Sequence, residues 1–125
     1  MSSINVEKTQ EEAAKAKLLP EPKGYRLLCA VPHVEEEFEG GIIKADNTIR
    51  AEEQTTVVLF VIKMGDLCYN DKDRFPTGAW CKEGDFVLTR PYAGTRLVIH
   101  GREFRIINDD TVEAVVDDPR GIRRV

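Results

Sequence analysis

The residues that could do chemistry in this sequence are two histidines, three cysteines and a short acidic run. His33 follows a proline at the end of an apolar segment, and His100 lies at a glycine-containing turn, so both are expected to face solvent. An active site needs a nucleophile, a base and an orienting group that converge on one point. Two isolated imidazoles do not supply such a set, and the sequence therefore predicts no catalytic histidine.

The cysteines are Cys29, Cys68 and Cys81, and they lack the paired spacing of a zinc site. Cys29 lies within an apolar run, which predicts a buried and unreactive thiol. An odd number of cysteines, combined with a polar N-terminal region that does not resemble a secretory signal, is typical of the reducing cytoplasm. We therefore expect a cytoplasmic protein without disulfides.

Two local patterns resemble binding motifs without fulfilling them. The acidic run at residues 35–39 lacks the alternating ligands and the distal glutamate of a calcium loop. Gly40 and Gly41 lack the following Lys-Ser/Thr of a phosphate-binding loop. The sequence thus predicts no metal, no cofactor and no enzymatic activity.

Composition limits the other classes of function. The chain has 125 residues, which is the size of one domain, and a net charge of -4. Nucleic-acid-binding proteins usually carry a basic patch, and single-stranded nucleic acid needs a basic groove with aromatic platforms. No apolar run approaches the ~20 residues that span a bilayer. Neither nucleic acid nor a membrane is an expected partner.

The N-terminal region has the pattern of a short helix. Residues 7–19 favour a helix in which Thr9 and Glu12 have capping-box spacing, and Pro20 ends it. A helix of about three turns is marginal alone in water. Whether it docks on the rest of the chain is left open by the sequence.

From Tyr25 onward the pattern changes to short apolar strands separated by turns. In the hairpin near His100, Leu97 and Ile99 are expected to face Phe104 and Ile106, with Arg105 among the residues that point outward. Frequent turns without strand–helix alternation favour an all-β antiparallel barrel or sandwich. The expected strands are residues 25–31, 55–64, 86–89, the hairpin at 97–106, and 111–116.

Between the first two strands, residues 34–54 hold few large apolar groups and read as a mobile loop. Ile42 and Ile43 follow the double glycine within this loop. These isoleucines either fold back onto the barrel or insert into a hydrophobic groove of a partner, with the loop ordering on contact. The local pattern leaves both alternatives open.

The order of these features resembles the GroES (chaperonin-10) family over about residues 24–117. The resemblance is carried by Gly40-Gly-Ile-Ile43, by Lys82-Glu-Gly-Asp-Phe-Val-Leu88, and by Tyr92-Ala-Gly-Thr95 leading to Asp109-Asp-Thr-Val-Glu-Ala-Val115. The terminal extensions and the segment from Arg74 to Trp80 look most similar to divergent versions encoded by bacteriophages. The implied organisation is an N-terminal extension (1–23), a GroES-like antiparallel β-barrel (24–117) with a mobile loop, and a C-terminal tail (118–125).

The resemblance implies a co-chaperonin whose seven copies form a ring that closes an ATP-bound, GroEL-type chaperonin over a client protein. The client would be folded in the cytoplasm, or in the host cytoplasm if the protein is viral, and a capsid protein is one candidate. The resemblance places the chaperonin-binding residues at Gly40, Gly41, Ile42, Ile43 and Lys44. It implies pairing of the first strand with the last strand of a neighbouring subunit, through Tyr25, Leu27, Cys29, Val31, Val112, Ala114 and Val116.

Two departures from the family pattern stand out. Lys44 occupies the position where the family usually has a third aliphatic residue, and residues 65–80 replace the hairpin that roofs the dome. In that span, Phe75 and Trp80 are expected to pack under a long loop rather than to contact a client. A different role, as a virion structural or decoration protein built on the same barrel, is the alternative.

Overall fold

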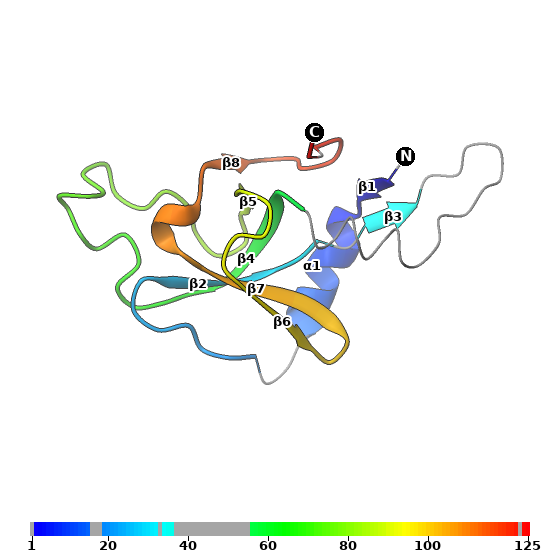
Figure 1. Cartoon of the computed structure of the whole chain (residues 1–125), viewed down its shortest axis with the longest axis horizontal. Helices are drawn as coiled ribbons and strands as arrows, with labels where there is room; N and C mark the ends of the chain where they lie inside the picture. The colour runs from blue at the N-terminus through cyan, green and yellow to red at the C-terminus, as the bar shows by residue number, and fades with distance from the viewer. Residues whose placement is uncertain (1, 16–18, 33, 37–55, 123) are drawn as a thin grey trace.

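The computed structural model describes residues 2–15, 19–32, 34–36, 56–122 and 124–125. Strands predominate in these residues, with a single α-helix near the N-terminus (Figure 1). The elements are β1 (Ser2–Ile4), α1 (Val6–Lys15), β2 (Arg26–Ala30), β3 (Val34–Glu36), β4 (Val58–Met64), β5 (Phe86–Leu88), β6 (Thr95–Ile99), β7 (Arg102–Asn108), the 3-10 helix η1 (Asp109–Thr111) and β8 (Ala114–Val116).

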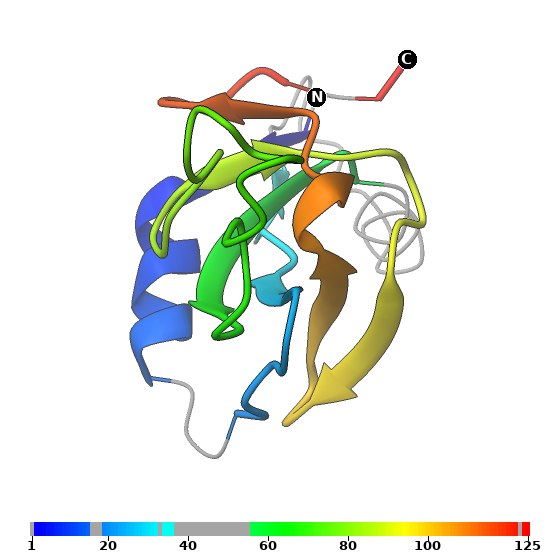
Figure 2. The same ribbon diagram turned by 90° about the vertical axis from the view of Figure 1, so that its left-hand side faces the viewer.

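Six strands form one sheet in the order β6-β7-β2-β4-β5-β8, and every neighbouring pair is antiparallel. The predicted all-β antiparallel fold is confirmed. The sheet is strongly curled (Figure 2). Its two edges are β6 and β8, and no hydrogen-bonded ladder joins them among the described residues, so the barrel is open at this seam.

A core cluster lies on each face of the sheet, and the central strands contribute to both because successive side chains of a strand point to opposite faces. The first core cluster gathers Leu27, Cys29, Leu59, Val61, Val87 and Ile107 with residues of the 65–81 connection. The second core cluster gathers Leu28, Ala30, Val58, Phe60, Phe86 and Phe104 with residues of both termini. Residues 58–61 of β4 are all buried, so this part of the strand is covered on both sides.

Strand β7 differs from the sequence-based expectation at Arg105. We expected Arg105 to point outward, and this was wrong: the side chain is fully buried, on the face that carries Ile107. Its guanidinium forms an ion pair with Glu103 at 3.5 Å, and it lies in register with Cys29 of β2. Burial lowers the pKa of Arg105, an effect that the Glu103 carboxylate opposes. The alternation of polar and apolar residues predicted that one face of β7 is exposed to solvent, although both faces of this strand are covered.

The N-terminal extension is docked on the sheet. Figures 1 and 2 place α1 alongside β4, while Ile4, Val6 and Leu19 pack into the second core cluster. The helix begins at Val6 and not at the predicted Glu7. Its cap is Asn5, whose Oδ1 accepts the Lys8 N–H at 2.9 Å. The predicted cap residue, Thr9, is a buried residue within the helix.

Candidate functional site

The predicted chaperonin-binding residues Gly40, Gly41, Ile42, Ile43 and Lys44 lie outside the described residues. The structure does describe the two ends of the segment that carries them. On one side β3 ends at Glu36, and on the other Thr56 Oγ1 accepts the Val58 N–H at 3.1 Å where β4 begins. Residues 34–36 were expected to belong to the mobile loop. That was wrong, since they form a strand paired with β1.

The residues predicted for the subunit interface divide into two groups. Leu27, Cys29 and Val31 are almost completely buried within the chain's own core. Both edges of β2 are already paired, one with β4 and the other with β7. Within this chain the side chains of these three residues are buried in its own core, and their assignment to a subunit interface stays a prediction.

The remaining interface candidates lie at the surface, with one exception. Tyr25 is 46% exposed, Ala114 is exposed and Val116 is partly buried, whereas Val112 is 4% exposed in the first core cluster. Strand β8 pairs with β5 on one side, and no described strand pairs with its other edge. An edge strand presents unpaired backbone groups on which another chain can add a strand. The outer edge of β8 is thus the surface that best fits the predicted interface with another subunit.

The connection between β4 and β5 covers the first core cluster without forming a strand anywhere in residues 65–85. It packs through three aromatic rings. Phe75 lies 4.9 Å from Tyr69 and 4.8 Å from Trp80 between ring centroids, in edge-to-face geometry. Phe75 is buried, while Trp80 keeps 43% of its surface exposed. The prediction of packing under a long loop is confirmed for Phe75, whereas Trp80 packs against Phe75 but is exposed at the surface.

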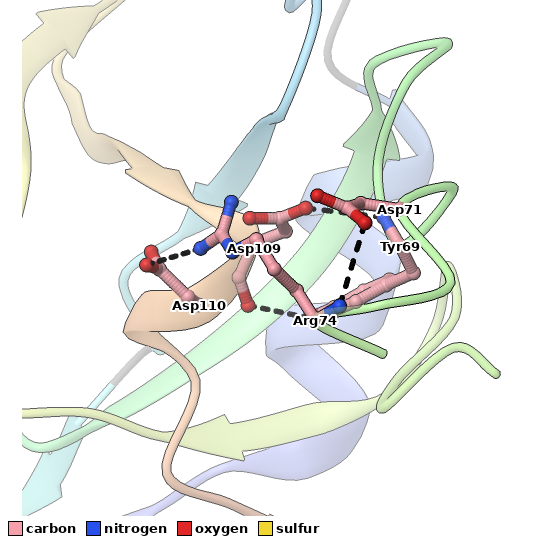
Figure 3. A network of polar contacts seen from close by, with 5 residues as sticks. All are labelled: Tyr69, Asp71, Arg74, Asp109 and Asp110. Atoms are coloured by element: carbon pink, nitrogen blue, oxygen red, sulfur yellow. Dashed lines mark hydrogen bonds and ion pairs between the residues drawn. The ribbon is translucent and has the colours of Figure 1, made fainter. Parts of the chain in front are cut away.

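A buried aspartate attaches this connection to the end of β7 (Figure 3). Asp109 is 1% exposed, and its Oδ2 accepts the Tyr69 N–H at 3.1 Å. The Tyr69 hydroxyl donates to the Asp109 carbonyl at 2.8 Å, and the Asp109 N–H donates to the carbonyl of Tyr25 at 2.8 Å. Sequence analysis named Asp109 only as part of the family motif and missed this role, for which the local pattern holds no signal.

At the surface beside it, Arg74 extends the contact (Figure 3). Its guanidinium forms an ion pair with Asp110 at 2.6 Å, and its backbone N–H donates to Asp71 Oδ1 at 3.4 Å. Both partners of the ion pair are about half exposed, so the pair contributes at most about 1 kcal/mol. The buried Asp109 is the stronger link between the two segments.

The three thiols are all in environments that disfavour the thiolate. Burial raises the pKa of Cys29 and of Cys81 and raises the pKa of Cys68 to about 11, so all three thiols stay protonated at neutral pH and are poor nucleophiles. His100 is exposed at the β6–β7 turn, as predicted, whereas His33 lies outside the described residues. Among the described residues, no group of three potential metal ligands comes together. The one helix in this part of the chain is too short and too polar to cross a bilayer.

Comparison with known proteins finds relatives over most of the chain. The chain is 33% identical over 96 residues to the co-chaperonin GroES of Methylacidiphilum infernorum, covering 77% of this chain and 92% of that protein. It is 32% identical over 96 residues to the co-chaperonin GroES of Lactobacillus delbrueckii subsp. bulgaricus, which is covered over 97% of its length. The co-chaperonin GroES of Caldicellulosiruptor saccharolyticus is 33% identical over 97 residues, with 96% of its length covered. No family model matches the chain.

Proposed function

Because this chain belongs to the GroES co-chaperonin family, we propose that it works as a co-chaperonin with a GroEL-type chaperonin and helps other proteins to fold. The observation that carries this proposal is coverage: the GroES relatives align over 92% to 97% of their own lengths. We propose that the protein has no catalytic activity. We also propose that it works in the cytoplasm.

Contact with the chaperonin is assigned to Gly40, Gly41, Ile42, Ile43 and Lys44. The support for this assignment is the sequence pattern, in which two isoleucines follow paired glycines in a polar stretch. Ordering about ten residues on binding costs roughly 1 kcal/mol each, so one such segment binds weakly. Lys44 can keep its ammonium group in water while its aliphatic stem lies along an apolar groove.

Assembly into a ring, with seven copies as the family resemblance implies, would turn these weak contacts into a stable lid. Several weak contacts made at once can exceed the single affinity by a factor of about 100 to 10,000. The position of β8 at the edge of the sheet supports a role in assembly, because no described strand pairs with its outer side and Ala114 in this strand is exposed. Weak individual contacts also allow the ring to leave when the chaperonin changes its nucleotide state.

The alternative of a virion structural protein finds no support in the relatives described above, which are co-chaperonins of bacteria. A capsid protein as client was proposed together with a bacteriophage origin. It now rests only on the terminal extensions and the divergent segment from Arg74 to Trp80. The exposed side chain of Trp80 does not by itself identify the client protein.

The proposed function predicts nucleotide-dependent binding to a purified double-ring bacterial chaperonin. In gel filtration the chain is expected to co-elute with the chaperonin when ATP is present and to separate from it when nucleotide is left out. The same elution position in both conditions, with no chain in the chaperonin fraction, would contradict the proposal. Sedimentation of the chain alone then shows whether it forms a ring.

A further inference from the structure

Strand β8 is short and lies at one edge of the sheet. It pairs with β5 over the three residues Ala114–Val116, and no described strand pairs with its other side. Just before the strand, the Glu113 N–H donates to the Leu88 carbonyl at 2.8 Å. So short a ladder supplies few hydrogen bonds, and each contributes little net free energy. The position of β8 therefore depends on what holds the residues that precede it.

The residues that precede β8 are held at the buried Asp109, the first residue of η1. Two of its hydrogen bonds go to Tyr69, one from the Tyr69 N–H to Asp109 Oδ2 and one from the Tyr69 hydroxyl to the Asp109 carbonyl (Figure 3). A third runs from the Asp109 N–H to the Tyr25 carbonyl. Val112, between η1 and β8, is buried in the first core cluster. The start of η1 is thus tied both to the residue before β2 and to the connection between β4 and β5.

Tyr69 makes these hydrogen bonds from a backbone conformation that tyrosine rarely adopts, with a φ of 59°. Such a conformation persists only where the surrounding contacts outweigh its cost. Here the ring packs edge-to-face on Phe75, and the hydroxyl also lies 3.3 Å from Cys81 Sγ. Burial raises the pKa of the Tyr69 hydroxyl, so it stays protonated and remains a donor. The contact with Asp109 is thus part of a fixed arrangement within the connection.

We propose that the contact between Tyr69 and Asp109 is a positioning contact for assembly, which fixes η1 and, through it, places the outer edge of β8 for pairing with a second copy of the chain. This inference rests on the proposed function, which assigns β8 to the contact between copies. The same contact reaches the backbone of Tyr25, whose side chain is 46% exposed and was also predicted to lie at that interface. A strand that is already fixed loses less conformational entropy when another chain adds to it.

Two variants weaken this contact from its two sides. Tyr69→Phe keeps the ring and removes the donor to the Asp109 carbonyl, whereas Asp109→Ala removes the acceptor of the Tyr69 N–H. The matched control is Leu28→Val, which shortens a fully buried side chain in β2, a strand that pairs with neither β5 nor β8. Because the control also lowers stability, it separates loss of the contact from loss of stability in general.

Amide hydrogen exchange of the full chain, diluted until it is unassembled, tests the hold on β8. In Tyr69→Phe and in Asp109→Ala the amides of residues 113–116 are expected to exchange at least tenfold faster, relative to the amides of β2 and β4 in the same protein. In Leu28→Val this ratio is expected to stay at its native value. A native ratio in both Tyr69→Phe and Asp109→Ala overturns the proposal.

Sedimentation velocity over a range of concentrations tests the consequence for assembly. Tyr69→Phe is expected to raise the chain concentration at half-assembly at least threefold and Asp109→Ala by more, while Leu28→Val leaves it within a factor of two of the native value. Native assembly in both contact variants, or an equal loss in Leu28→Val, overturns the positioning role and leaves the proposed function standing. If the native chain does not assemble at any concentration, the positioning role falls together with the proposed ring, and co-elution with the chaperonin still decides the rest of the proposed function.

Discussion

The double variant Ile42→Ser/Ile43→Ser is expected to abolish ATP-dependent co-elution with the chaperonin while leaving the fold intact. Burying an isoleucine side chain contributes about 1.5–3 kcal/mol, so removing both weakens each contact by at least a hundredfold. In a ring the loss applies to every copy that is engaged at once. Gel filtration with ATP measures the effect, and denaturant unfolding followed by fluorescence of the single tryptophan, Trp80, checks the fold.

A matched control is available within the same stretch of sequence. Ile49→Ser removes an isoleucine of the same size that lies outside the Gly-Gly-Ile-Ile pattern, and it is expected to retain co-elution. Co-elution of the double variant at the native level would remove Ile42 and Ile43 from the binding site. Loss of binding in Ile49→Ser as well would show that the whole segment, and not the motif, makes the contact.

The variant Asp109→Ala is expected to lower the free energy of unfolding by about 2–4 kcal/mol, a large part of the about 5–15 kcal/mol that stabilises a domain. The physical reason is that the buried Tyr69 N–H loses its acceptor, Asp109 Oδ2, without gaining water in its place. Chemical denaturation followed by Trp80 fluorescence is a suitable measurement, since Trp80 lies 5.9 Å from Tyr69 between ring centroids.

The neighbouring aspartate is the control. Asp110 carries the same charge and pairs with Arg74, but both groups are about half exposed. Asp110→Ala is therefore expected to change the free energy of unfolding by less than about 1 kcal/mol. Asp109→Asn, which keeps an acceptor oxygen, should fall between the two. Equal losses in Asp109→Ala and Asp110→Ala would show that the buried hydrogen bond contributes little.

Much of the fold could be predicted from local sequence. The apolar runs at residues 25–31 and 55–64 predicted strands β2 and β4, and the turn at His100 predicted the β6–β7 hairpin. These elements are set by backbone propensity and by residues a few positions apart, which are visible in the chain itself. The motifs and their order along the chain also indicated the co-chaperonin family, and the GroES relatives confirm it.

The arrangement of those strands could not be predicted in the same way. The alternating pattern shows which residues share a face, but it does not show what covers that face or which strands flank it. This is why the side chain of Arg105 was placed in solvent.

The sequence by itself thus determined the all-β class, most strands, the hairpin and the family. The tertiary structure alone decided that the N-terminal extension packs on the sheet, that β1 pairs with β3, and that Asp109 is buried beneath Tyr69. These last three features join residues far apart in sequence: thirty to thirty-four positions for β1 and β3, and forty positions for Asp109 and Tyr69. Their free energy comes from burial and hydrogen bonding between segments that only the folded chain brings together, and no local pattern records which segments will meet.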